Sequence, residues 1–454
     1  MRKTINLLEG NIFTSLTGLA IPIMLTSLVQ MAYNMTDMIW IGRLSSDAVA
    51  AVGSAGMYMW LANGLVTMAK LGSQIKIAHT LGANDKNEAT EYTKSALHLG
   101  IGFGVIYGLI SVIFATQLIG FFNLNSLQVI ADAKIYLMVT CGLVVFSFMN
   151  QIFTGILTAM GNSKTSFTAT AIGLIINIIL DPILIFGFGF IPAMGVLGAA
   201  IATVIAQAVV MTVFIYSVKE DTVIFSNVKL FSKPSMKHIR SITLIGLPAA
   251  IQSMIFTGIS MIIARFIAGW GDSAIAVQKV GSQIESISWM TAEGFAAAVN
   301  SFVAQNFGAN NIKRAKKGVT TAMGVVIVWG CFSTMLLIVF PEFIFKIFIP
   351  EAELLGMGVD YLRILGVSQL LMCIEITTAG AFQGFGKTMP PSIVGIILTS
   401  ARIPMVIVLS ATALKLNGIW WSISISSILK GVVLLTWFII FIKKYEKTHQ
   451  ESKI

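Results

Sequence analysis

Two aspartate residues lie inside long apolar runs of the sequence and are the first candidates for chemistry. Asp37 follows Asn34 by three residues, and Asp181 follows Asn177 by four. Both spacings place the amide and the acid on the same face of a helix. Pro182 has no N–H to donate, so the carbonyl group of the residue one turn earlier loses its usual helical partner.

Carboxylates, amide oxygens and a free carbonyl group are suited to a hard monovalent cation or a proton. Ionisable groups at membrane depth are costly to bury and are usually functional. The alternative is a structural one, in which the polar groups of Asp37 and Asp181 only hold two helices together. The residue types leave both possibilities open, and they do not distinguish Na⁺ from H⁺.

A second group of ionisable residues lies in apolar runs of the C-terminal half. Glu285 and Glu293 are eight residues apart, so they occupy roughly the same side of one helix. We expect at least one of them to attract cationic substrates electrostatically. Methionine side chains could form a polarizable wall for varied ligands or simply fill the core. The candidate substrate residues are Glu285, Glu293, Glu375, Gln278, Met254, Met261 and Met290.

The composition indicates a membrane protein. Of 454 residues, 56% are hydrophobic and 11% are charged, whereas a soluble domain has about 25% charged residues. The net charge of +10 comes from short clusters between apolar runs. This distribution excludes a nucleic-acid surface and is typical of loops that set membrane orientation.

Twelve apolar stretches are long enough to span a bilayer, which takes roughly 20 residues. They are residues 13–42, 48–78, 93–122, 131–160, 163–187, 194–217, 238–269, 273–305, 317–348, 354–384, 388–413 and 416–442. Lysine and arginine concentrate in alternate loops and in the tail from Lys443, which predicts a multi-pass protein of the inner or plasma membrane with both termini in the cytoplasm.

The two halves of the chain resemble each other. Pro22 and Pro248 are 226 positions apart, as are Gly82 and Gly308 in two similar Gly-Ala-Asn sequences. Six helices are an even number, so the two repeats would have the same orientation, as in transporters built from parallel repeats. The sequence therefore predicts an all-α fold with an N-lobe at 1–218, a cytoplasmic linker at 219–237, a C-lobe at 238–442 and a cytoplasmic tail at 443–454.

The acids are not repeated. At the same offset, Asp37 corresponds to Ile263, and alignment of Pro182 with Pro404 makes Asp181 correspond to Ile403. A polar group needed only to hold a six-helix bundle together should occur in both halves. The asymmetry favours a specialised function for the two aspartates.

The sequence gives no support for an enzyme. Residues 381–388 approach a phosphate-binding loop, but the first glycine is missing and the segment ends a predicted membrane helix instead of following a strand. The four histidines have no metal-ligand spacing, and the three cysteines lie singly in apolar runs. We expect no catalytic residue and no cofactor.

The motifs taken together resemble a known family. The chain is similar to the multidrug and toxic compound extrusion (MATE) transporters over essentially its whole length. The resemblance rests on Leu8–Gly10, Ile21-Pro22, Tyr33–Asp37, Ile41-Gly42, Ala48–Gly53, Gly72–Gln74, Leu81–Ala83, Ile178–Pro182 and Gly384–Thr388. It implies twelve helices in two six-helix lobes that form a V around a central cleft.

The resemblance also implies a cation site. In DinF-like members it lies in the N-lobe, where the acidic positions match Asp37 and Asp181 and an asparagine matches Asn177. A helix 6 threonine matches Thr203, and Asn150 joins the same polar cluster. Na⁺ would then bind at Asp37, Asn177, Asp181 and Thr203, with Asn34 nearby.

NorM-like members of the same family instead carry acids on helices 7 and 10. This chain has Phe256 near the first of these positions, and Glu375 is displaced by about one turn from the second. The resemblance therefore favours the DinF-like branch.

The expected function is secondary active efflux of small amphipathic or cationic compounds by antiport with Na⁺ or H⁺, with alternating access between two lobes. The alternative is a flippase of related architecture for a lipid or a lipid-linked precursor, because Arg265, Lys279 and Arg402 could form a cationic cleft. A channel would explain the repeats and the paired acids less well. We expect a monomer that contacts membrane lipid and binds no nucleic acid.

Overall fold

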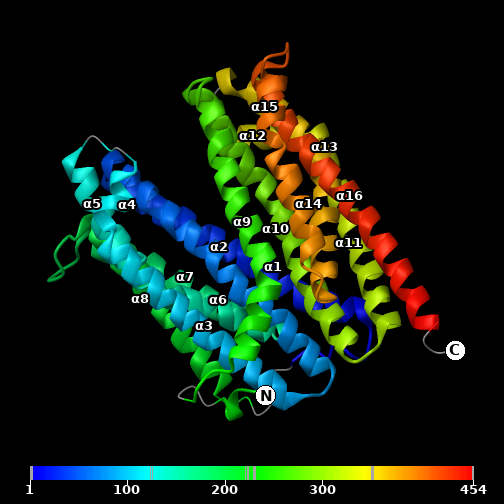
Figure 1. The fold of residues 1–454 in the computed structure, drawn as a ribbon. Coiled ribbons are helices and arrows are strands. Elements are labelled where there is room, and N and C mark those ends of the chain that lie inside the picture. Colours follow the sequence, from blue (N-terminus) through cyan, green and yellow to red (C-terminus); the bar gives the residue numbers. More distant parts are fainter. Residues whose placement is uncertain are drawn as a thin grey trace. The chain divides into compact units, whose positions relative to one another are not determined.

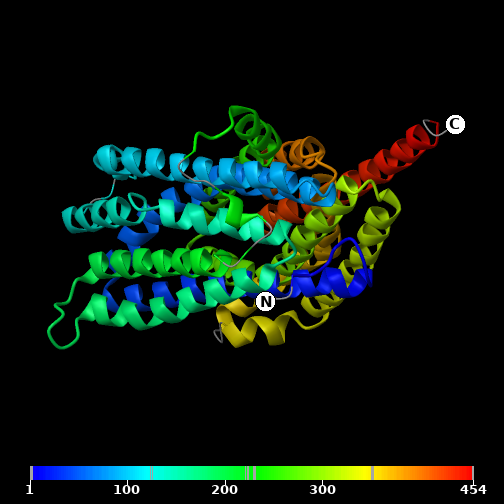
Figure 2. The same cartoon turned by 90° about the horizontal axis from the view of Figure 1, so that it is seen from below.

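The computed structural model describes residues 4–122, 124, 126–219, 221, 224–228, 232–348 and 352–451. The described residues form helices, with one isolated bridge between Phe188 and Ile191. Figure 1 shows the helices in sequence colours, and Figure 2 shows them from below.

The first half contains eight α-helices and a short 3₁₀ helix. They are α1 (Ile12–Leu44), α2 (Ser46–Gly82), α3 (Lys86–Ile113), α4 (Ala115–Gly120), α5 (Leu127–Thr140), α6 (Val145–Ala159), α7 (Ser163–Phe186), α8 (Gly195–Val218) and η1 (Phe225–Asn227). The second half contains α9 (Met236–Ala268), α10 (Asp272–Gly308), α11 (Ile312–Val339), α12 (Pro341–Phe348), α13 (Ala352–Gly384), α14 (Met389–Ser400), α15 (Arg402–Ser410) and α16 (Lys415–Glu451).

The predicted all-α membrane fold is confirmed. Among the described residues, ten helices are long and apolar enough to cross a membrane, or eleven if the bent pair of α5 and α6 is one span. The remaining predicted span, 273–305, coincides with α10, which has 37 residues. Each of the twelve predicted spans thus contains one long helix or one helix broken in two, and the spans at 93–122 and 317–348 also include the separate short helices α4 and α12.

Two predicted spans are broken near their middles. The span at 131–160 bends by 46° between α5 and α6. The span at 388–413 is divided into α14 and α15. Pro404 cannot donate to the carbonyl group four residues earlier, which accounts for the second break.

The repeat is visible in the helix boundaries. Residues 46 and 272 begin α2 and α10, residues 82 and 308 end them, and both pairs are 226 apart. The helices α3 and α11 have 28 residues each and the same offset at both ends. The two halves therefore repeat one order of helices.

A tight turn explains the repeated Gly-Ala-Asn sequence. Asn84 and Asn310 have positive φ angles of 59° and 56°, a conformation that asparagine tolerates better than most residues. The next residues, Asp85 and Asn311, cap α3 and α11 by accepting a hydrogen bond from a backbone N–H in the first turn. The motif thus ends one helix and begins the next within four residues.

The chain forms two compact units. Unit 1 contains the residues up to Asn6 and Ile21–Ala250, and unit 2 contains Leu7–Ala20 and the residues from Ile251 onward. The helices α1 and α9 therefore each contribute to both units, and they change from one to the other close to Pro22 and Pro248. The predicted lobes place the boundary at the linker 219–237, part of which lies outside the described residues. This division stays a prediction.

Glycines allow the beginning of α9 to pack closely on α2 within unit 1. A Cβ atom at Gly246 would overlap the carbonyl group of Met68, and one at Gly72 would overlap that of Ile242. Small residues at such contacts are typical of packed membrane helices. These glycines fix the close approach of the two helices.

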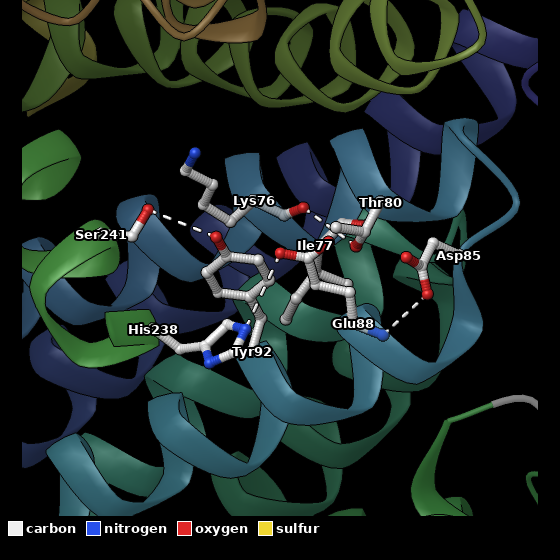
Figure 3. A network of polar contacts seen from close by, with 8 residues as sticks. All are labelled: Lys76, Ile77, Thr80, Asp85, Glu88, Tyr92, His238 and Ser241. Atoms are coloured by element: carbon white, nitrogen blue, oxygen red, sulfur yellow. Dashed lines mark hydrogen bonds and ion pairs between the residues drawn. The ribbon is translucent and has the colours of Figure 1, made fainter. Parts of the chain in front are cut away.

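A polar network holds the same part of α9 against α2 and α3 (Figure 3). The Tyr92 hydroxyl donates to Ser241 Oγ over 3.4 Å, and His238 Nε2 lies 3.8 Å from Glu88 Oε1. The Tyr92 ring meets the His238 ring edge to face at 4.5 Å, and the Lys76 ammonium lies 5.9 Å from the Tyr92 ring centre. Residues 236–250 thus belong to unit 1 by specific contacts.

Candidate functional site

The two predicted aspartates meet inside unit 1. Asp37 lies on α1 and is 8% exposed, whereas Asp181 lies on α7 and is 0% exposed. Their carboxyl groups are close enough to interact electrostatically. They are 144 positions apart in the sequence, so tertiary packing brings them together.

Apolar contacts between α1 and α7 hold the pair in place. The Trp40 ring meets the Phe186 ring at 6.2 Å in an edge-on arrangement. Ile41 and Ile185, with 0% and 1% exposure, belong to one core cluster. These residues lie three to five positions beyond the two acids, so the apolar packing sets the spacing of the carboxyl groups.

Asn177 orients Asp181. Its Nδ2 atom donates to Asp181 Oδ1 over 3.0 Å, and the spacing of four residues places the two side chains on the same face of α7. In the described part of the chain, three oxygen atoms of the site are buried and have no hydrogen-bond partner: Asp37 Oδ1, Asn177 Oδ1 and Asp181 Oδ2. Buried polar atoms are usually paired, so these oxygens are available to a bound cation or proton.

Two residues on neighbouring helices extend the polar region. The Thr203 hydroxyl on α8 is also buried without a hydrogen-bond partner among the described residues. Asn150 on α6 donates to the backbone and side-chain oxygens of Gln207 on α8, over 2.9 and 2.8 Å. Its Nδ2 atom is therefore engaged by α8. Asn34 is exposed on α1, so the structure does not bring it into the buried cluster.

Two tyrosines also border the site, although the sequence predicted no role there for either of them. Tyr33 on α1 lies close to Asp37, Thr203 and Gln207. Tyr136 on α5 is buried near Asp37 and Thr203. The spacing of four residues between Tyr33 and Asp37 was the one available signal. Both phenol groups border the carboxyl pair.

The oxygen atoms at this site are of the chemical type that binds a monovalent cation or a proton. Among the described residues, there is no group of three or more His, Cys, Asp or Glu side chains that could hold a metal ion. Two carboxyl groups, an amide oxygen and a hydroxyl group instead offer hard oxygen ligands.

The corresponding positions of unit 2 are apolar. Ile263 is 4% exposed and belongs to the core cluster of unit 2, and Ile403 packs against that cluster. The repeat therefore builds a carboxyl pair in one unit and a hydrophobic core in the other. This agrees with the asymmetry seen in the sequence.

The candidate substrate residues of unit 2 have different environments. Glu293, Met254 and Met261 are exposed, and Met290 is half-buried. Glu285 and Gln278 instead join a hydrogen-bonded chain with Tyr361, and Glu375 is buried in an ion pair. Glu285 and Glu375 thus have hydrogen-bond or ion-pair partners inside the unit, and Glu293 is exposed on α10.

The family is shown by the sequence. The model of the MatE family matches residues 22–183 and 248–408, which begin at the two prolines of the predicted repeat. Among curated relatives, the chain is 28% identical over 431 residues to the probable multidrug resistance protein NorM of Thermotoga maritima, with 93% of this chain and 91% of the relative covered. It is 26% identical over 422 residues to the multidrug export protein MepA of Staphylococcus aureus, with 92% and 91% covered.

Solved structures have the same fold. A crystal structure of MATE in complex with MaD3S has a TM-score of 0.90 and 25% identity, and covers 98% of this chain and 100% of that one. An outward-facing multidrug resistance MATE family transporter of the MOP superfamily has a TM-score of 0.90 and 25% identity, with 98% and 99% covered. These similarities extend over both repeats.

Proposed function

The chain belongs to the MatE family of membrane transporters, and from this membership we propose that it is a secondary active exporter of small amphipathic or cationic compounds. Export is driven by exchange for Na⁺ or H⁺ at Asp37 and Asp181. The protein works as a monomer in the inner or plasma membrane, with both termini in the cytoplasm. It is a transporter and not an enzyme.

The observation that carries this proposal is the buried carboxyl pair of unit 1. Asp37 and Asp181 lie close to each other, and each has an oxygen atom without a hydrogen-bond partner among the described residues. Two like charges in a low dielectric are unfavourable when both are ionised. Binding of Na⁺ or a proton relieves this cost, so the site has a physical reason to take up an ion.

Coupling follows if the ion favours one packing of α1 and α7 over another. A ligand shifts a conformational equilibrium only by its difference in affinity for the two states. An ion that binds between two helices has a different affinity for the state in which the helices are separated. By thermodynamic linkage, the ion then changes the affinity for the exported compound by the same factor as the compound changes the affinity for the ion.

The names of the relatives support the class of substrate. Proteins called multidrug resistance and multidrug export proteins align with this chain over more than nine tenths of its length. The flippase is not favoured by these comparisons. We also propose that the chain belongs with DinF-like members, because its carboxyl pair lies on α1 and α7 and the corresponding positions of the second repeat are apolar.

Transport by the purified protein in proteoliposomes tests this function. A fluorescent organic cation should accumulate on one side of the membrane when an opposing Na⁺ or H⁺ gradient is imposed. Collapse of that gradient with an ionophore should stop accumulation. Accumulation that is the same with and without both gradients would contradict antiport, and transfer of a labelled lipid alone would favour the flippase.

A further inference from the structure

Unit 2 contains a buried cluster of four charged residues. Glu285 lies on α10, Glu375 on α13, Arg402 at the start of α15 and Lys430 on α16. Glu375, Arg402 and Lys430 are 8%, 5% and 7% exposed, and Glu285 is half-buried. Two acids and two bases balance in charge, so the cluster is neutral without any bound ion.

Lys430 is the direct partner of Glu375. Its Nζ atom lies 3.0 Å from Glu375 Oε2, and both side chains are about nine tenths buried. A buried ion pair contributes little net stability, because desolvation offsets the attraction. Stability alone is therefore a weak reason for this pair.

Arg402 is fixed beside the pair by the same turn of α16. Its Nε atom donates to Ser426 Oγ over 2.6 Å, and its NH2 atom donates to Ser427 Oγ over 3.2 Å. These serines come four and three residues before Lys430. The Arg402 guanidinium also lies 5.8 Å from the Phe256 ring centre and interacts electrostatically with Glu375 and Glu285.

Glu285 is satisfied by neutral donors. Its Oε1 atom accepts from the Tyr361 hydroxyl over 2.9 Å, and its Oε2 atom accepts from Gln369 Nε2 over 3.3 Å. Trp420 and Gln278 continue this chain of hydrogen bonds behind Tyr361. Both carboxylates of the cluster thus have hydrogen-bond or ion-pair partners within unit 2.

We propose that the Lys430 ammonium is a built-in cation, which occupies at Glu375 the position that a free monovalent cation would otherwise take. The proposal deepens the proposed function, on which it rests: unit 1 exchanges an ion, and unit 2 carries a permanent one. A lysine ammonium has the charge of Na⁺ or ammonium and three donors on a flexible stem. Because it is covalently attached, its local concentration excludes a free competitor.

Removal of the Lys430 side chain tests this assignment. Lys430→Ala leaves Glu375 buried without its counter-ion and leaves space where the side chain was. In choline chloride the purified Lys430→Ala protein should melt at a lower temperature than the wild type. Ammonium or sodium at the same ionic strength should raise its melting temperature more than that of the wild type, because a ligand that binds the native state stabilises it.

Two controls make the test specific. Lys430→Ala/Glu375→Gln removes both charges and should lose the selective response to ammonium and sodium. Lys443→Ala removes an exposed lysine of the same helix and should respond as the wild type does. The binding of radioactive sodium is compared with and without Lys430→Ala in an Asp37→Asn background, so that the proposed site of unit 1 contributes equally to both proteins.

The expected result is sodium binding that appears with Lys430→Ala and disappears with the added Glu375→Gln. The inference is wrong if Lys430→Ala gains no sodium binding, if it responds to cations no more than the double variant does, or if it fails to fold at any ammonium or sodium concentration. Failure of the proposed function has a different outcome, in which Asp37→Asn alone retains normal exchange.

Discussion

Asn177 donates a hydrogen bond from Nδ2 to Oδ1 of Asp181 over 3.0 Å, one helical turn along α7. Among the described residues, the oxygen of the same amide group and the second oxygen of Asp181 are both buried without a hydrogen-bond partner. Asn177 therefore has two roles in the proposed site. It orients the acid, and it supplies a further oxygen ligand.

Replacement of Asn177 tests both roles. A hydrogen bond to a charged group contributes about 1.5–3 kcal/mol, so for sodium-driven export Asn177→Ala should raise the half-saturating sodium concentration at least tenfold. The maximal rate should fall less. Asn34→Ala, at an exposed position of α1, is the control. Equal effects of the two substitutions would count against a role of Asn177 in ion binding.

The close contact between α2 and α9 gives a stability prediction. A Cβ atom at Gly246 would overlap the carbonyl group of Met68, and such overpacking costs about 1–3 kcal/mol. We expect Gly246→Ala to lower the melting temperature of the purified protein. Gly258→Ala on the same helix meets nothing within 4 Å and should be neutral or slightly stabilising. Identical melting temperatures for both variants would show that this contact is not tight.

Glu293 gives a prediction about substrate charge. Its side chain is exposed on α10, whereas Glu285 on the same helix is hydrogen-bonded inside unit 2. We expect Glu293→Gln to slow export of cationic compounds more than export of neutral ones of similar size. Parallel transport assays with a matched pair of dyes measure this. Equal loss for both dyes would indicate a structural or coupling role instead.

The orientation of the chain is tested at the predicted linker. The charge distribution predicts that Ser232 lies in the cytoplasm. A cysteine introduced there, in a protein without its native cysteines, should react with an impermeant reagent only after the cells are made permeable. Efficient labelling from outside intact cells would reverse the predicted topology.

Much of the fold could be predicted because membrane helices are encoded locally. Apolar length defined the twelve spans, and repeated glycine and proline positions revealed the two halves. The breaks were harder to predict: Pro404 gave a local signal for the second one, whereas the bend between α5 and α6 has no proline in its sequence. Spacing alone could not locate the bend.

The site was predictable where its residues share a helix or carry unusual charge. Asn177 and Asp181 are neighbours on α7, so their hydrogen bond follows from a spacing of four residues. Tyr136 was missed because an aromatic residue in an apolar helix has no distinctive pattern, and its position depends on how α5 packs. The pairing of Lys430 with Glu375 was equally hidden, since it joins α16 to α13 across 55 positions.

The most direct measurement is gradient-driven export by Asp37→Asn and Asp181→Asn proteins in proteoliposomes. Both variants should insert and fold, because asparagine keeps the size of the side chain, and both should lose accumulation of substrate against its gradient. Asp132→Asn, which alters a partly exposed acid of unit 1, should keep it. If well-folded Asp37→Asn and Asp181→Asn proteins still export substrate against its gradient at the normal rate, ion coupling at the carboxyl pair of unit 1 is contradicted.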